Sequence, residues 1–96
     1  RMKVKVKERR NVNFTSPSDY PWPTIIVDVT HRPLSDFYVI TTLGAKHALV
    51  IPGSCSSTWS RKTLWDRVKG RHREFWLCPR EQALAWQDGL NVMKTF

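Results

Sequence analysis

Hydrophobic and polar residues alternate at the start of the chain with a period of two, which is the spacing of a β-strand. Met2, Val4 and Val6 fall on one side of residues 2–7. The other side holds three lysines, which are Lys3, Lys5 and Lys7. The pattern predicts a strand with one wet, cationic face.

Three further segments are rich in β-branched and aromatic residues, which favour strands. They are residues 24–30 (TIIVDVT), 36–43 (DFYVITTL) and 46–51 (KHALVI). Turn residues separate them at hairpin distance, so we expect the three to form an antiparallel meander. Residues 11–23, which contain three prolines and several Asn, Ser and Asp residues, predict a long loop before the meander.

The period changes in the second half of the chain, where residues 60–69 predict an amphipathic helix ended by Gly70. Residues 71–77 suggest a short strand. Pro79 then opens a second predicted helix over 79–87, ended by Gly89. Strands followed by helices indicate an α+β fold. We therefore expect a single domain over 1–96, with a small antiparallel β meander of three to four strands followed by two short helices.

Composition narrows the class of protein. The chain has 96 residues with 16 Lys and Arg against 8 Asp and Glu, a formal net charge of +8. A domain of this size has little room for a deep active-site cavity beside its core. The longest stretch without a charged residue, His47 to Ser60, is shorter than the roughly 20 apolar residues of a membrane span. No secretory signal is evident, so we expect a cytoplasmic protein, with free thiols at Cys55 and Cys78 favoured over a disulfide.

The positive charge is concentrated in residues 1–10 and 61–73, which together hold twelve of the sixteen cations. Clustered cations raise the local potential and attract phosphates or acidic proteins. The alternative is a merely solvated helix face, with ion pairs such as Lys62 with Asp66. The candidate binding residues of the second cluster are Arg61, Lys62, Arg67, Lys69, Arg71 and Arg73, and those of the first cluster are Lys3, Lys5 and Lys7.

Five tryptophans are a high count for this length. Trp65 and Trp76 lie in apolar patterns that predict core positions. Trp22, between Pro21 and Pro23 in the loop, has no such pattern. A contact with a base or a partner's pocket and packing over a sheet edge are equally open for it.

Catalysis has little support in the sequence. Cys55 or a neighbouring serine would need His47 or His31 as a base, yet no nucleophile-elbow motif surrounds them. The spacing of the cysteines and histidines matches no zinc motif, and Asp28 and Asp36 have no partners typical of a metal-dependent nuclease. We predict a protein that is not an enzyme and has no cofactor and no metal site.

Taken whole, the chain resembles the small basic accessory proteins of lambdoid phage recombination operons, and in particular their anti-RecBCD proteins. The likeness rests on length, on charge and on the runs KVKVKERR (Lys3 to Arg10) and SRKTLWDRVKGRHREFW (Ser60 to Trp76). It implies a non-enzymatic protein that binds the host's DNA end-processing helicase–nuclease, so that phage DNA ends survive and recombine. The alternative is direct DNA or RNA binding through the basic, aromatic segment 59–76.

Overall fold

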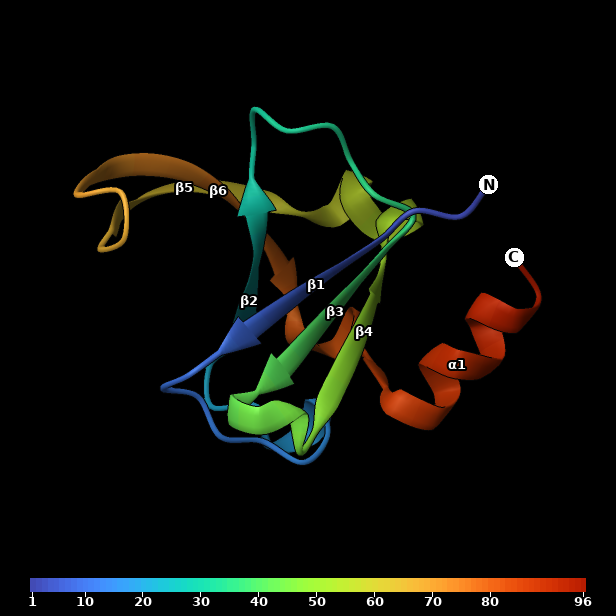
Figure 1. Ribbon diagram of the computed structural model, residues 1–96. Helices are drawn as coiled ribbons and strands as arrows, with labels where there is room; N and C mark the ends of the chain where they lie inside the picture. Colours follow the sequence, from blue (N-terminus) through green and yellow to red (C-terminus); the bar gives the residue numbers. More distant parts are fainter.

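The computed structural model describes residues 1–96 and contains two β-sheets (Figure 1). Sheet A has the strand order β1-β3-β4-β7, and sheet B has the order β2-β6-β5. β1 runs parallel to β3, whereas all other pairs are antiparallel. The strands are β1 (Val4–Arg9), β2 (Thr24–Val29), β3 (Phe37–Thr42), β4 (Ala48–Pro52), β5 (Ser60–Asp66), β6 (Arg71–Pro79) and β7 (Leu84–Ala85).

The core lies between the two sheets, where their buried faces meet. Sheet A contributes Tyr38, Ile40, Leu49 and Ile51, and sheet B contributes Ile25, Val27 and Cys78. Aromatic side chains extend this cluster, because the ring of Trp59 lies 5.8 Å from that of Tyr38 and 6.3 Å from that of Trp76. Burying this apolar surface is the main force that holds the sheets together.

The one α-helix, α1 (Trp86–Lys94), covers part of the opposite face of sheet A (Figure 1). Met93 packs there against a small buried cluster formed by Phe37, Val39 and Val50. Gly89 lets the helix approach closely, since a Cβ at this position would overlap the Val50 side chain. No helix in the structure has the length and apolar character needed to cross a bilayer.

The loop between β1 and β2 contains only the 3₁₀ turn η1 (Pro17–Asp19). Its Phe14 and Tyr20 side chains are buried in the core, which ties the loop to the sheets. Three other 3₁₀ turns occur, η2 (Leu43–Ala45), η3 (Gly53–Thr58) and η4 (Arg80–Gln82).

The mixed α and β composition with antiparallel pairing agrees with the predicted fold class. The predicted pairing of the strands in the meander is wrong. β3 and β4 form the expected hairpin, whereas β2 pairs with β6 in the other sheet and β1 adds to β3. The strands number seven rather than three to four. β2 belongs to sheet B because this position lets Ile25 and Val27, both fully buried, pack across the core against sheet A.

Both predicted helices are wrong. Residues 60–66 form strand β5, and Gly70, with φ of +64°, belongs to a hairpin turn instead of ending a helix. Pro79 ends β6, and the only α-helix begins at Trp86 and continues past Gly89.

Candidate nucleic-acid interface

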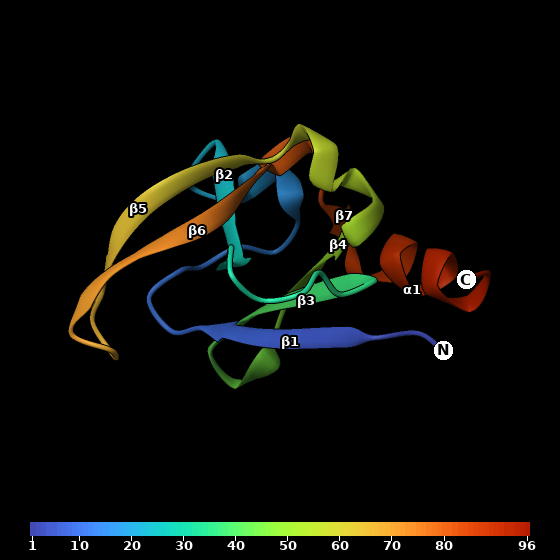
Figure 2. The same cartoon turned by 90° about the horizontal axis from the view of Figure 1, so that it is seen from above.

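β5 and β6 form a two-stranded hairpin that leaves the body of the protein and curves away from it (Figures 1 and 2). β2 accompanies β6 only between Phe75 and Pro79, whereas β5 pairs with β6 out to Asp66 and Arg71. The ribbon beyond Phe75, residues 63–74, therefore has no third strand. We call residues 61–74, which add the two residues of β5 at its base, the arm.

The arm carries all six basic residues of the second predicted cluster. They are Arg61, Lys62, Arg67, Lys69, Arg71 and Arg73, set against the carboxylates of Asp66 and Glu74. Only Arg73 makes a salt bridge, with 2.9 Å from its Nη1 to Oδ2 of Asp66. The structure thus brings the predicted residues together, on a strand ribbon and its turn instead of on a helix, and leaves five of them without a carboxylate partner.

Side chains alternate along each strand, and opposite pairs share a face. One face of the arm carries Lys62, Leu64, Arg71 and Arg73, whereas the other carries Trp65 and His72, with Arg61 at the base as its only Lys or Arg. The Trp65 and His72 rings meet edge to face at 5.1 Å, and Trp65 is 56% exposed, so its predicted core position is wrong. At the base of the arm the Arg61 guanidinium lies over the Trp76 ring, 5.9 Å from its centre, in a cation–π contact.

The arm turn is built by Asp66. Its Oδ1 accepts hydrogen bonds from the backbone N–H groups of Val68 (3.0 Å) and Lys69 (3.1 Å). Its own carbonyl accepts the Gly70 N–H at 2.8 Å. The Lys69 N–H and the Arg73 guanidinium together hold the pKa of the Asp66 carboxyl below its usual value, since both stabilise the charged form. The turn is therefore closed by a charged group at neutral pH.

Trp22 lies beside the base of the arm. It is 52% exposed, and its ring meets that of buried Tyr20 edge to face at 6.0 Å. A shallow cavity of about 200 Å³ places Trp22 with Lys62 and Leu64 of the arm and with Arg9 of β1. Trp22 is thus packed on one side and open on the other, and its contact with a base or a partner stays a prediction.

The N-terminal lysines occupy a different place from the one predicted. The wet face of β1 carries Val4 and Val6, the latter 66% exposed, while Lys5 and Lys7 turn toward β2. Their ammonium groups lie 3.0 and 2.8 Å from the carboxylate of Asp28, which is only 2% exposed. The predicted cationic face is therefore wrong, because a buried acid on another strand attracts both lysines. Lys3 keeps an exposed side chain, and its backbone N–H donates to Asp36 at 2.7 Å.

Asp28 has more salt-bridge partners than any other acid in the protein. Burial alone would raise the pKa of Asp28, but hydrogen bonds from Lys7, Lys5 and the Val29 N–H outweigh it and lower the pKa. Arg32 adds a longer contact of 3.5 Å. Burial also lowers the pKa of Lys7 more than Asp28 raises it. This cluster joins the two sheets at the edge of the core.

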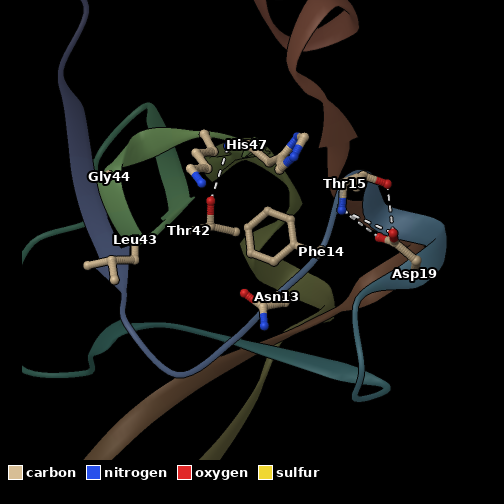
Figure 3. Close-up of a pocket in the computed structure, with 9 residues that line it drawn as sticks. Asn13, Phe14, Thr15, Asp19, Thr42, Leu43, Gly44 and His47 are labelled. Carbon is tan, nitrogen blue, oxygen red and sulfur yellow. Dashed lines mark hydrogen bonds between the residues drawn. The ribbon is translucent and has the colours of Figure 1, made fainter.

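A separate cavity lies between the loop that follows β1 and the turn between β3 and β4. The cavity of about 640 Å³ in Figure 3 is bordered by the ring of Phe14, by Thr42 and by His47, whose backbone N–H donates to the Thr42 hydroxyl at 3.1 Å. Asp19 at its edge accepts hydrogen bonds from Thr15 of the same loop. No His, Cys, Asp and Glu side chains gather in a group of three or more that suits a metal ion.

The two cysteines are free thiols. Burial raises the pKa of the Cys78 thiol to about 12, whereas Cys55 is only partly buried. No hydrogen bond joins Cys55 to His31 or His47.

Comparison with protein-family models, with curated proteins and with solved structures found no match to this chain.

The roles of three residues here were not predicted: Asp28 as the acid that holds Lys5 and Lys7, Asp66 as the residue that closes the turn, and Val68 as its exposed apolar residue. Asp28 has no local sequence signal for this role, because its partners Lys5 and Lys7 lie on a strand some twenty positions earlier. Asp66 had one, because an aspartate four positions before a glycine, between β-branched or aromatic segments, is typical of a hairpin turn.

Proposed function

We propose that the protein is a non-enzymatic nucleic-acid-binding protein that grips duplex DNA with its arm. The observation that supports this best is the arm itself, a projecting two-stranded ribbon with six cations and a single salt bridge. Two-stranded ribbons of this kind enter DNA grooves, where the flanking phosphates lie within reach of side chains on either face. Cations along one face of the ribbon and at its turn suit that placement.

The free cations set the expected salt dependence. Five arm residues have no carboxylate partner, so about five phosphates can be neutralised, which gives a slope of log affinity against log salt near −4.5. Affinity should then fall about 500-fold between 50 and 200 mM salt. Such binding has little sequence preference, since phosphate contacts position a protein without reading bases.

Fluorescence anisotropy with a labelled duplex at several salt concentrations tests the proposal. The triple variant Arg67→Gln/Lys69→Gln/Arg71→Gln should bind more weakly, with a slope shallower by about 2.7. The control Arg1→Gln/Lys46→Gln/Lys94→Gln removes the same charge from other exposed positions and should keep the steep slope. Equal behaviour of the two triple variants, or no salt-dependent binding by the wild type, would overturn the proposal.

A second candidate function is modulation of a host helicase–nuclease of the RecBCD type in the cytoplasm of a phage-infected cell. The half-exposed Trp22 favours it, because a tryptophan packed on one side and open on the other is a typical anchor in protein interfaces. The likeness to anti-RecBCD proteins suggests the partner class.

Capture of the purified helicase–nuclease by the immobilised protein tests this second function. Trp22→Ala should weaken capture at least tenfold, whereas Trp86→Ala, which removes a tryptophan of α1 that is 44% exposed, should leave it unchanged. No complex at micromolar concentration would exclude this function and leave the DNA proposal standing.

A further inference from the structure

The apex of the arm carries an apolar side chain in the most exposed position of the molecule. Val68 is 92% exposed, more than any other large hydrophobic residue of the chain. It lies in the four-residue turn between Asp66 and Arg71, at the end of the arm farthest from the body (Figure 2).

The turn does not need a valine. Its backbone is determined by the Asp66 carboxylate, which holds two N–H groups, and by Gly70, which supplies the positive φ. Turn positions ordinarily favour Gly, Asn, Asp, Ser or Pro, and a β-branched residue gains nothing there from its side chain. The hydrogen bond from the Val68 N–H to Asp66 nevertheless holds the backbone of Val68, so the side chain extends from a preorganised turn.

The surroundings of Val68 are cationic. Arg67 and Lys69 flank it directly and Arg71 follows, all without a carboxylate partner, since Asp66 is engaged by Arg73. An apolar tip among cations matches the chemistry of a DNA groove, in which phosphates line both walls and the base stack forms the floor.

We propose that Val68 is a wedge that enters the minor groove, inserts between two adjacent base pairs and kinks the duplex. This inference rests on the proposed DNA-binding function and adds deformation of the DNA to it. Proteins that bend DNA insert single apolar side chains into a base step in this way and gain contact area from the bend. Arg67 and Lys69 would hold the phosphates on either side of the opened step.

The alternative partner for the arm tip is a bilayer surface, because cations beside apolar residues also suit anionic lipid headgroups. The duplex is favoured because a wedge needs only one apolar side chain at the apex, whereas interfacial anchoring needs a broad apolar face. Trp65, although 56% exposed, lies on a strand of the ribbon with its ring against His72, whereas Val68 lies in the turn.

Energy transfer between dyes at the two ends of a duplex of about 30 base pairs, recorded together with anisotropy, tests the wedge. The duplex carries a central TA step, which unstacks easily, and 2-aminopurine beside that step. Wild-type protein should bring the ends together and raise the 2-aminopurine fluorescence. Val68→Ala should bind within about threefold of wild type, because the phosphate contacts remain, yet lose most of both signals.

Two controls separate the possible outcomes. Val68→Leu should keep the bend, and Val92→Ala, on the exposed side of α1, should leave both signals unchanged. Binding without a bend, or an equal bend by Val68→Ala, would overturn the wedge and leave the DNA-binding function intact. Absence of binding would overturn both, as would tight binding of the same tip to phosphatidylserine vesicles with none to DNA.

Discussion

Replacing Asp28 with asparagine tests whether the buried ion cluster holds the two sheets together. Asn has the shape of Asp but no charge, so Lys5 and Lys7 would face each other beside the core without their counter-charge. The Asp28 carboxylate is 2% exposed, whereas the side chains of Lys5 and Lys7 are 33% and 20% exposed. The lysines can therefore recover part of their hydration after the substitution.

These exposures set the size of the effect. Removing one partner of a fully buried ion pair costs about 3–5 kcal/mol of unfolding free energy. Partial rehydration of the two ammonium groups reduces this, so we expect a loss of about 2–3 kcal/mol for Asp28→Asn at neutral pH. For a domain of this size such a loss lowers the Tm by about 10–20 °C.

Thermal and urea unfolding, followed by circular dichroism and tryptophan fluorescence, measure the change. The matched control is Glu81→Gln, which removes one exposed carboxylate and should change the free energy of unfolding by less than about 0.5 kcal/mol. Equal stability of Asp28→Asn and Glu81→Gln would refute the reasoning, because the cluster would then contribute nothing beyond surface charge.

The pH dependence provides an independent check. The pKa of Asp28 is lowered in the folded state, so the carboxylate stabilises the fold fully above its unfolded pKa of about 3.9 and loses that contribution as the pH falls through the lowered value. The stability difference between wild type and Asp28→Asn should thus be largest near neutral pH and should shrink below about pH 4. A difference that is constant from pH 7 to pH 2 would contradict the assignment.

Two further predictions concern packing and thiol reactivity. Gly89→Ala should destabilise the protein by about 1 kcal/mol in urea unfolding, because the cost of overlap with Val50 exceeds the gain in helix propensity. The control Asn91→Ala, in the same helix, should not destabilise the protein. Equal effects of the two substitutions would refute the close contact. At pH 8 the native protein should react rapidly with only one equivalent of a thiol reagent, through the partly buried Cys55. Cys78 should not react, because it is buried and its thiol pKa is raised to about 12. Fast reaction of a Cys55→Ser variant would contradict this.

Local pattern was enough for strand positions but not for strand partners. The segments predicted at 24–30, 36–43 and 46–51 match β2, β3 and β4 within about two residues at each end. Pairing of β2 with β6 depends on which buried faces meet across the core, and that information is spread over both halves of the chain. Adjacent segments favour adjacent pairing only as a tendency.

The arm shows why periodicity failed in the second half. A core-facing strand alternates between buried and exposed positions, but a free ribbon has two wet faces and no such constraint. The spacing of Leu64, Trp65 and Val68 is therefore compatible with a helix as well. The candidate cations still lie on one structural element, because residues 61–73 form a single hairpin instead of a helix and the segment after it.

The prediction of which face of β1 points inward was wrong for a related reason. Alternation at residues 2–7 predicts a strand but does not say which side points inward, and hydrophobicity favours the valines. The buried carboxylate of Asp28 reverses this choice, since lysine stems can cover apolar surface while their ammonium groups reach the acid.

The pairing of β2 with β6 has a consequence for how the protein is made. Thr24 pairs with Pro79, so sheet B cannot form on the ribosome until nearly the whole chain shown here has left the exit tunnel. Until then, Ile25 and Val27 lack the partner that buries them, and the nascent chain exposes a hydrophobic strand edge. Long-range pairing of this kind slows folding, so the early segment depends on rapid release, or on a chaperone, to avoid association with other chains.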